Sequence, residues 1–89
     1  MIFEFDSSKS QSNKEKHGID FIEAQILWED EFYIELATRS DIENRFIVIG
    51  KIGEKHYSAC ITYRKEAVRI ISVRRAREKE VALYESRRV

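Results

Sequence analysis

Three arginines directly follow a short apolar run in the stretch VRIISVRRAREKE, residues 68–80. Guanidinium groups such as those of Arg74, Arg75 and Arg77 suit phosphate because they stay charged and bind two oxygens at once. Placed together without acidic partners, they repel one another until an anion binds. The cluster therefore indicates a phosphate-binding site. The alternative is an ordinary strand end whose charge is neutralised by Glu78, by Glu80 or by acids of the first half of the chain.

A second set of polar residues follows a helical spacing. Steps of three or four places bring their side chains together on a helix, and the set is Lys9, Asn13, Lys16 and His17. Positive neighbours favour the neutral form of a histidine, which can then take up a proton near neutral pH. The alternative is that His17 only contacts the helix end and that the lysines are solvated.

Metal and cofactor chemistry have little support in the sequence. His17 and His56 are far apart, and neither an H-x-x-x-H nor a C-x-x-C spacing occurs. No glycine-rich phosphate loop is present. Cys60 lies among apolar residues and is expected to pack rather than to react. We therefore expect no metal site and no cofactor.

Length and composition predict one domain, residues 1–89. The chain is 43% hydrophobic and 36% charged, which is typical of a globular protein. No apolar run approaches the roughly 18 residues that cross a membrane, and the first residues lack the pattern of a secretory signal. With a single cysteine, the chain is expected to work in the reducing cytoplasm, away from membranes.

The zero net charge hides a strong asymmetry between the two halves of the chain. Residues 1–44 carry 11 acids and 4 Lys or Arg, a balance of −7. Residues 45–89 carry 5 acids and 12 Lys or Arg, a balance of +7. Such a split permits a basic surface for nucleic acid, and it equally permits the two halves to pair within the fold.

Cap and turn residues divide the chain into short elements that must position these side chains. Asp6 predicts the start of a helix that Gly18 ends, and Asp20 precedes a second helix. Helices are expected at 7–17, 21–28 and 76–86, and strands at 2–5, 32–40, 45–52, 57–64 and 68–75. The expected class is α+β in the order β-α-α-β-β-β-α, a small antiparallel sheet with two N-terminal helices and one C-terminal helix.

Alternation along the last two strands predicts which side chains share a face of the sheet. In 57–64 one face is apolar and packs on the helices, and the other is polar and open: Ser58, Cys60, Thr62 and Arg64. In 68–75 two sets alternate, Val68, Ile70, Ser72 and Arg74 on one face and Arg69, Ile71, Val73 and Arg75 on the other. If Arg74 lies on the open face, it shares one rim with Arg64.

Three stretches together resemble the BrnT family. The opening FEFDSSKSQSNKEKHGIDFIEAQILWED resembles the family pattern F-E-W-D-x-x-K-x-x-x-N-x-x-K-H-G-[VI]-x-F-x-E-A. ENRFIVIG resembles its E-x-R-F-x-x-I-G segment, and ITYRKEAVRIISVRRAREKEVALYE resembles its Y-T-x-R-x-x-x-x-R-I-I-S-A-R-K-A-x-x-x-E-x-x-x-Y ending. Order and spacing are kept over nearly the whole chain. Phe5 stands where the family has Trp, and Val73 where it has Ala.

The resemblance implies a fold, an activity and a partner. BrnT proteins are toxins of type II toxin–antitoxin pairs, look like RelE/ParE-type folds, and act as ribonucleases that stop translation by degrading RNA. It implies a BrnA-type antitoxin that binds DNA, so that the toxin reaches DNA only within a hetero-oligomer. The polar residues that match the family patterns are Lys9, Asn13, Lys16, His17, Arg45, Arg64, Arg69, Arg74, Glu80 and Tyr84.

A metal-independent endoribonuclease uses the RNA's own 2′-hydroxyl as nucleophile, so it needs no Ser or Cys nucleophile. It needs groups that move protons and cations that stabilise the phosphorane. We expect Arg64 and Arg74 to hold the scissile phosphate, and His17 or a lysine, Lys16 or Lys9, to move a proton. The other expected RNA contacts are Lys9, Asn13, Arg69, Arg75 and Arg77. The alternative is a non-catalytic module whose basic face docks an antitoxin or RNA.

Overall fold

Four consecutive segments pair as antiparallel strands in the computed structural model, which describes residues 1–39, 41 and 43–88. They are β2 (Ile34–Thr38), β3 (Arg45–Ile52), β4 (Lys55–Arg64) and β5 (Ala67–Arg75). A fifth strand, β1 (Ile2–Glu4), lies parallel to β5, so the sheet has the order β1-β5-β4-β3-β2. Gly53, with φ of 62°, makes the tight turn between β3 and β4, where a side chain would strain the backbone.

The sheet confirms the predicted α+β class and is consistent with a RelE-like fold, but it differs from the prediction in two details. The strand-like pattern of 32–40 becomes β2, so the chain has one strand more than the order β-α-α-β-β-β-α contains. The sheet is mixed rather than purely antiparallel, because β1 occupies the edge beside β5 and runs in the same direction.

The first helix has the bounds that its cap residues predict. α1 (Ser7–His17) begins after Asp6, whose Oδ1 accepts a hydrogen bond from the Lys9 N–H at 3.1 Å. It ends at Gly18, which has φ of 76°, and the Gly18 N–H donates to the Lys14 carbonyl.

The other two helices are shorter or shifted relative to the sequence prediction. η1 (Glu23–Glu29) is a 3-10 helix, and the Asp20 carboxylate accepts hydrogen bonds from two N–H groups at its start. α2 (Glu78–Arg88) begins two residues later than predicted, where Glu80 Oε1 accepts the Arg77 N–H at 2.8 Å. Within the described residues, no helix is both long and apolar enough to cross a membrane.

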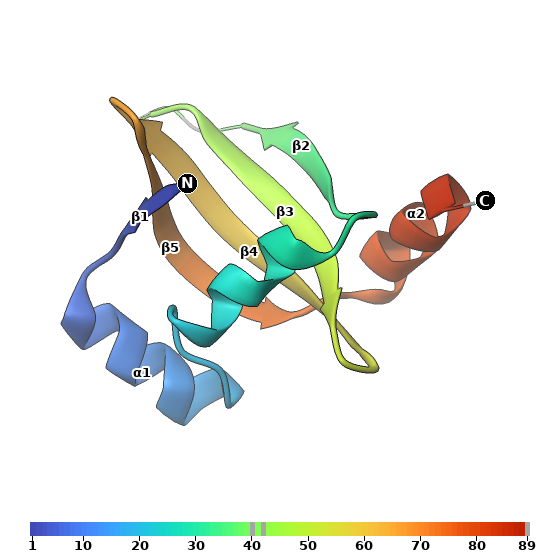
Figure 1. Cartoon of the computed structure of the whole chain (residues 1–89), viewed down its shortest axis with the longest axis horizontal. Helices are drawn as coiled ribbons and strands as arrows, with labels where there is room; N and C mark the ends of the chain where they lie inside the picture. Colours follow the sequence, from blue (N-terminus) through green and yellow to red (C-terminus); the bar gives the residue numbers. More distant parts are fainter. Residues whose placement is uncertain (40, 42, 89) are drawn as a thin grey trace.

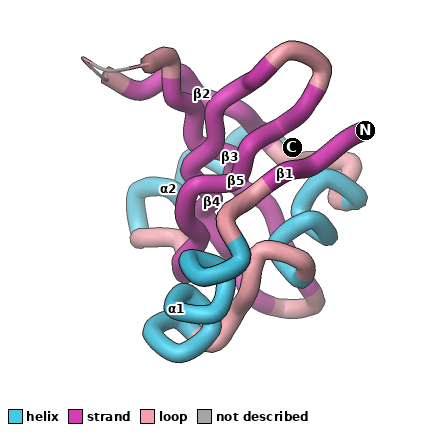
Figure 2. The backbone as a smooth tube through the Cα atoms, turned by 90° about the vertical axis from the view of Figure 1, so that its left-hand side faces the viewer, coloured by secondary structure: helices cyan, strands magenta, loops and turns pink. Residues whose placement is uncertain are grey.

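The helices take three different places around the sheet. Figure 1 shows η1 lying across one face, over β3 and β4, and α2 beside β3 at the far end of the chain. Figure 2 looks onto the edge formed by β1 and β5, with α1 running along it and the other two helices on opposite sides of the sheet. The two faces of the sheet are therefore covered unequally.

The main core lies between η1 and the sheet, as the apolar face predicted for residues 57–64 requires. It contains Ile19, Phe21, Ala24, Leu27, Val48, Ala59, Ile61, Val68, Ile70 and Val73. A smaller cluster lies on the opposite face under α2 and contains Ile34, Ile49 and Tyr84. The rest of that second face, toward the end of β4 that carries Thr62 and Arg64, lies beyond this cluster and carries polar side chains. We call it the open face.

A β-bulge changes which side chains of β5 share a face. Ile61 pairs with Ile70, but Cys60 pairs with Ser72, so Ile71 is an extra residue in β5. The prediction that Val68, Ile70, Ser72 and Arg74 share a face is therefore wrong. Val68, Ile70 and Val73 enter the main core, whereas Arg69, Ser72 and Arg74 pair with the open-face residues of β4.

Candidate nucleic-acid interface

The helix α1 is attached to the sheet edge by polar rather than apolar side chains. Only Ser10 and Asn13 of this helix are buried. The Asn13 amide donates to the Val73 carbonyl at 2.8 Å and accepts from the Val73 N–H at 3.2 Å, the pair of bonds that a neighbouring strand residue would exchange. Its second N–H donates to the Ile19 carbonyl, and Ser10 Oγ accepts the Phe21 N–H. This attachment explains how a helix with almost no apolar residue docks on the fold.

A hollow of ≈ 230 Å³ lies where α1 meets the bulge of β5. Four polar residues of α1 line it together with Asn13, namely Lys9, Ser12, Lys16 and His17. Phe21, Ile71 and Ser72 complete the lining. The bulge thus contributes directly to the hollow, since both Ile71 and Ser72 belong to the irregular stretch of β5. The helical spacing predicted this gathering of Lys9, Lys16 and His17, and the structure brings them to one hollow.

The cations of this hollow have no ionic partner in the part of the chain that the structure describes. Within residues 1–39, 41 and 43–88, no carboxylate lies within ion-pair distance of Lys9, Lys16 or His17. Lys14 on the same helix differs, because its Nζ lies 2.8 Å from Glu23 Oε1 and this hydrogen bond raises its pKa. The unpaired side chains therefore gather on the side of α1 that faces the hollow.

Two arginines flank the middle of the open face. One row of paired residues crosses all five strands: Thr38, Arg45, Thr62, Arg69 and Glu4. We call Arg45, Thr62 and Arg69 the arginine row. Arg69 Nη1 lies 3.5 Å from Glu4 Oε1, and Arg45 Nη2 lies 3.8 Å from Glu43 Oε2.

Both distances in the arginine row are longer than the roughly 2.7–2.9 Å of a charge-assisted hydrogen bond. In addition, Arg45 Nε is buried without a hydrogen-bond partner. The Nη groups of these two arginines therefore keep donors that an anion can use, whereas the buried Arg45 Nε is out of reach of an anion. Arg45 matches the family pattern in the sequence, but the strand register alone shows that it lies in one row with Arg69, on the other side of Thr62.

Arg74 is engaged in a tight ion pair within the fold. Its Nη1 and Nη2 donate to Glu80 Oε1 and Oε2 at 2.8 and 3.0 Å, a bidentate arrangement. The Arg74 hydrogen bonds lower the pKa of Glu80, and the bond from the Arg77 N–H acts in the same direction, whereas burial opposes them. For Arg74 the structure therefore supports the ordinary strand end over the phosphate-binding cluster, because an acid of α2 neutralises it.

Arg64 and Arg74 do not lie together, which corrects the expected shared rim. Arg74 pairs with Ser58 near the start of β4, and Arg64 is the last residue of that strand. Six residues of extended chain separate the two positions by roughly 20 Å. Neither lies in the α1 hollow. Their proposed roles on one scissile phosphate therefore lose the geometry on which they depended.

The other two arginines of the cluster point elsewhere. Arg75 pairs with Tyr57 across β4 and β5, and its guanidinium lies 5.7 Å from the centre of the Tyr57 ring. Arg77 is exposed at the start of α2. The three arginine side chains of the RRAR run therefore have three different surroundings, and they do not form a single phosphate-binding cluster.

Cys60 lies between these groups on the open face. Burial raises the pKa of its thiol, while Arg45 and Arg74 act in the opposite direction. Arg45 of β3 and Arg74 of β5 therefore both exert their positive charge on the Cys60 thiol, which lies on the strand between them. Among the described residues, no group of three or more His, Cys, Asp or Glu side chains is placed to share a metal ion.

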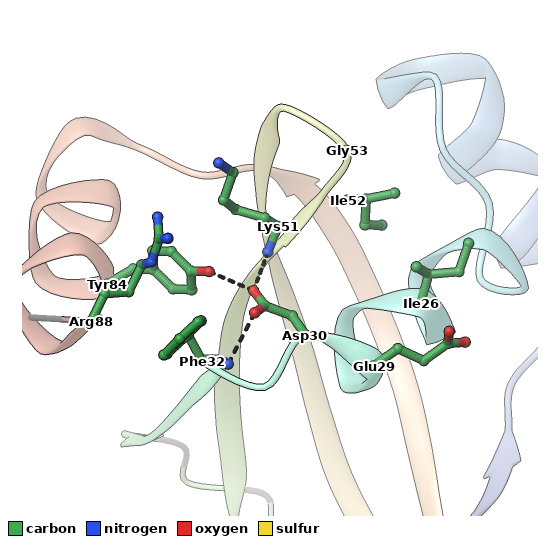
Figure 3. Close-up of a pocket in the computed structure, with 9 residues that line it drawn as sticks. All are labelled: Ile26, Glu29, Asp30, Phe32, Lys51, Ile52, Gly53, Tyr84 and Arg88. Carbon is green, nitrogen blue, oxygen red and sulfur yellow. Dashed lines mark hydrogen bonds between the residues drawn. The ribbon is translucent and has the colours of Figure 1, made fainter.

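Asp30, the residue that follows η1, links α2 to the rest of the fold (Figure 3). Asp30 Oδ2 accepts hydrogen bonds from the Tyr84 hydroxyl at 2.6 Å and from the Lys51 N–H at 2.8 Å, and Oδ1 accepts the Phe32 N–H at 2.9 Å. Burial raises the pKa of Asp30, but these hydrogen bonds outweigh it and the net shift is downward. Both oxygens of the Asp30 carboxylate thus accept hydrogen bonds from the fold itself, although a hollow of ≈ 300 Å³ opens beside them.

A family model described as "Ribonuclease toxin, BrnT, of type II toxin-antitoxin system" matches residues 5–80. The chain belongs to this family. The match covers α1 with its unpaired cations, the arginine row and the Arg74–Glu80 pair, so these candidate groups all lie inside the BrnT region. Membership in the family makes the protein a ribonuclease toxin of a type II system and implies an antitoxin partner. No curated protein matches the chain.

Proposed function

We propose that the protein is a metal-independent endoribonuclease whose reacting phosphate binds in the α1 hollow. The observation that carries the proposal is the convergence on one hollow of Lys9, Lys16 and His17, which have no ionic partner among the described residues. Its charged lining residues are cations, whereas a hard metal ion would need carboxylate or carbonyl oxygens there. A polyanion is the ligand that such a lining favours.

The chemistry requires only the side chains of the hollow and the RNA itself. The 2′-hydroxyl oxygen bonds to phosphorus while the bond from phosphorus to the 5′ oxygen breaks. In this proposal His17 and Lys16 share the two proton transfers: one of them takes the 2′ proton and the other supplies a proton to the leaving 5′ oxygen. Lys9 stabilises the phosphorane charge. The products are a 2′,3′-cyclic phosphate and a 5′-hydroxyl end. The exposed Ser72 hydroxyl can donate a hydrogen bond to a phosphate oxygen.

The arginine row gives the RNA a second set of phosphate contacts. Ser72 lines the α1 hollow and also pairs with Cys60 on the open face, two residues along β4 from Thr62. Two residues of a strand span about 7 Å. A single RNA strand can therefore run from the α1 hollow past Ser72 to Arg69 and Arg45.

The partner proposed for this activity is a BrnA-type antitoxin. In this proposal the antitoxin forms a hetero-oligomer with the toxin, blocks the cleavage of RNA and binds DNA, so that this chain meets DNA only through it. Uncontrolled cleavage of RNA stops translation. Because translation takes place in the cytoplasm, the proposed activity places the protein there.

Purified protein and a mixed-sequence RNA test the proposal directly. In the presence of EDTA we expect cleavage that leaves 2′,3′-cyclic phosphate ends, and we expect no cleavage of a 2′-O-methyl copy of the same RNA. Adding the antitoxin should stop the reaction. If the protein binds the RNA and leaves it intact with or without Mg²⁺, the non-catalytic module is the correct function. If cleavage requires a metal ion, the metal-independent mechanism is wrong.

A further inference from the structure

Asn13 lies where the walls of the α1 hollow meet. Besides α1 itself, the turn after the helix contributes Phe21 to the lining, and the bulge of β5 contributes Ile71 and Ser72. The Asn13 side chain bonds to both of these other walls. It reaches the turn at the Ile19 carbonyl, and it reaches β5 at Val73, the residue after Ser72.

The Asn13 amide has no donor left for a phosphate oxygen of RNA, although the sequence predicts an RNA contact here. A side-chain amide carries two N–H donors. Its nitrogen donates to the Ile19 carbonyl and to the Val73 carbonyl, each at 2.8 Å, and its oxygen accepts the Val73 N–H. The residue is only 8% exposed. Asn13 must therefore serve the hollow without touching the RNA.

The place of Asn13 in the helix gives it control over the cations. Lys9 lies one turn before it, and Lys16 and His17 lie one turn after it on the same side of α1. Apart from Asn13, the only buried residue of the helix is Ser10, which bonds to the Phe21 N–H outside the lining. The distance of the three cations from β5 is therefore set largely at Asn13.

The strand side of the hollow depends on the same amide. β1 pairs with β5 only at residues 67–69, so Val73 lies beyond the end of β1. A bulge disrupts the regular ladder of hydrogen bonds. Directly after this bulge, Asn13 supplies the pair of bonds that a strand would give to Val73, and it thereby holds the neighbouring Ser72 toward the hollow.

We propose that Asn13 is a positioning residue for RNA cleavage, whose amide sets the separation between the cations of α1 and Ser72 in the bulge. The inference rests on the proposed cleavage in the α1 hollow, and it adds the group that holds the two sides of that hollow at a fixed distance. A misplacement of about 1 Å lowers the rate of an enzyme roughly 10²-fold, even when the altered residue lies away from the reacting atoms.

Single-turnover cleavage at saturating RNA tests the proposal, because the amplitude reports the folded fraction and the rate constant reports the folded molecules alone. Asn13→Ala and the isosteric Asn13→Asp, which loses both donors, should each lower the rate constant about 10²-fold. Two controls should keep the parental rate constant. Ser10→Ala removes the other buried bond of the same helix, and Gln11→Glu converts an exposed amide of α1 to a carboxylate.

NMR of the two histidines gives a second measurement that needs no cleavage. His17 lines the hollow, whereas His56 bonds to Glu85 of α2 and serves as an internal reference. A 2′-O-methyl RNA octamer, which cannot be cleaved, should shift the ring signals of His17 in the parent and in Ser10→Ala. In Asn13→Ala the octamer should still bind through the arginine row, but the shift of His17 should shrink.

Four outcomes overturn the inference. Parental rate constants with smaller amplitudes would make Asn13 a residue of the fold alone, and an equal loss of rate in Ser10→Ala would show that any loosening of α1 has this effect. A loss of octamer affinity as large as the loss of rate would make Asn13 an RNA contact. An octamer that leaves His17 of the parent unshifted would place RNA elsewhere. Failure of the proposed cleavage is seen separately, as a parent that leaves RNA intact, and the His17 signals then decide on Asn13.

Discussion

The two α-helices α1 and α2 both attach to the sheet by polar side chains, but they use charge in opposite ways. α1 is held by the neutral groups of Ser10 and Asn13, and its Lys9, Lys16 and His17 are left without ionic partners among the described residues. α2 is held by the buried Tyr84 ring and, in addition, by charged groups, as the Arg74–Glu80 pair and the hydrogen bond between His56 and Glu85 at 2.7 Å show.

This difference separates the charges that build the fold from those available to a ligand. A carboxylate in a bidentate pair accepts two hydrogen bonds from the arginine and neutralises its charge. A phosphate can bind that arginine only by displacing the carboxylate. A lysine on a helix held by an amide has no such competitor. The pairing state of each cation, rather than its place in a basic run, is therefore the basis on which we propose where RNA binds.

The two histidines give the largest expected contrast between these regions. His17→Gln should lower the rate of RNA cleavage about 10²–10⁴-fold, because it removes the group that moves a proton in the hollow. His56→Gln should leave the rate unchanged and lower the melting temperature, because the His56 ring bonds to Glu85 and packs on Tyr84, both in α2. Single-turnover cleavage and thermal unfolding measure the two effects. A parental rate for His17→Gln would assign the proton transfer elsewhere.

Asn13→Ala should produce the largest loss of stability on the α1 side. It leaves the Val73 N–H and the carbonyls of Val73 and Ile19 without their partner, and the expected cost is about 2–3 kcal/mol. Ser12→Ala on the exposed part of the same helix is the control and should change the free energy of unfolding by less than about 0.5 kcal/mol. Urea denaturation measures both. Equal stabilities of the two variants would contradict the structural role of Asn13.

Glu80→Gln tests the α2 side through its dependence on pH. The folded state lowers the pKa of Glu80 below its ordinary value of 4.5, chiefly through Arg74, so the folded state binds fewer protons in this range. The stabilisation is fully present above about pH 4.5 and is lost as the pH falls through the lower, folded value. At pH 7 the variant should be about 1–2 kcal/mol less stable, and at pH 3 the difference should shrink. A constant difference from pH 7 to pH 3 would show that charge pairing is not its cause.

The smallest expected effect concerns the salt dependence of RNA binding. Removing one cation that neutralises a phosphate of single-stranded RNA makes the slope of log K against log salt shallower by about 0.7. Arg69→Gln should show this reduction, because Arg69 is loosely paired, while Arg74→Gln should keep the parental slope. Anisotropy titrations over a series of KCl concentrations measure the slopes. The opposite ranking of the two variants would place the RNA on the α2 side.

Much of the fold could be predicted from residues with strong local preferences. Asp6 and Gly18 fix the ends of α1 because a carboxylate accepts the first N–H groups and glycine adopts positive φ without strain. Helical spacing alone also brings Lys9, Lys16 and His17 together. These signals act within a few residues, so they do not depend on how the elements later pack.

The parts of the site that could not be predicted depend on strand register. The extra residue Ile71 has no signature in an apolar run such as VRIISV, yet it decides that Arg69 and Ser72 share the open face. Likewise, nothing in the sequence distinguishes Arg74 from Arg64, since only the docking of α2 brings Glu80 to one of them. Arg45 and Arg69 are far apart in the chain, and they lie in one row only because each is the strand partner of Thr62.

The amide of Asn13 has a further consequence for the behaviour of the protein in a crowded cell. Beyond β1, the backbone of β5 would present unpaired groups to solvent, and such an edge is a template on which another chain can add a strand and start to aggregate. α1 closes this edge with a side chain that imitates a neighbouring strand at Val73. The helix that we propose to receive RNA therefore also blocks this part of the β5 edge against strand addition by another chain.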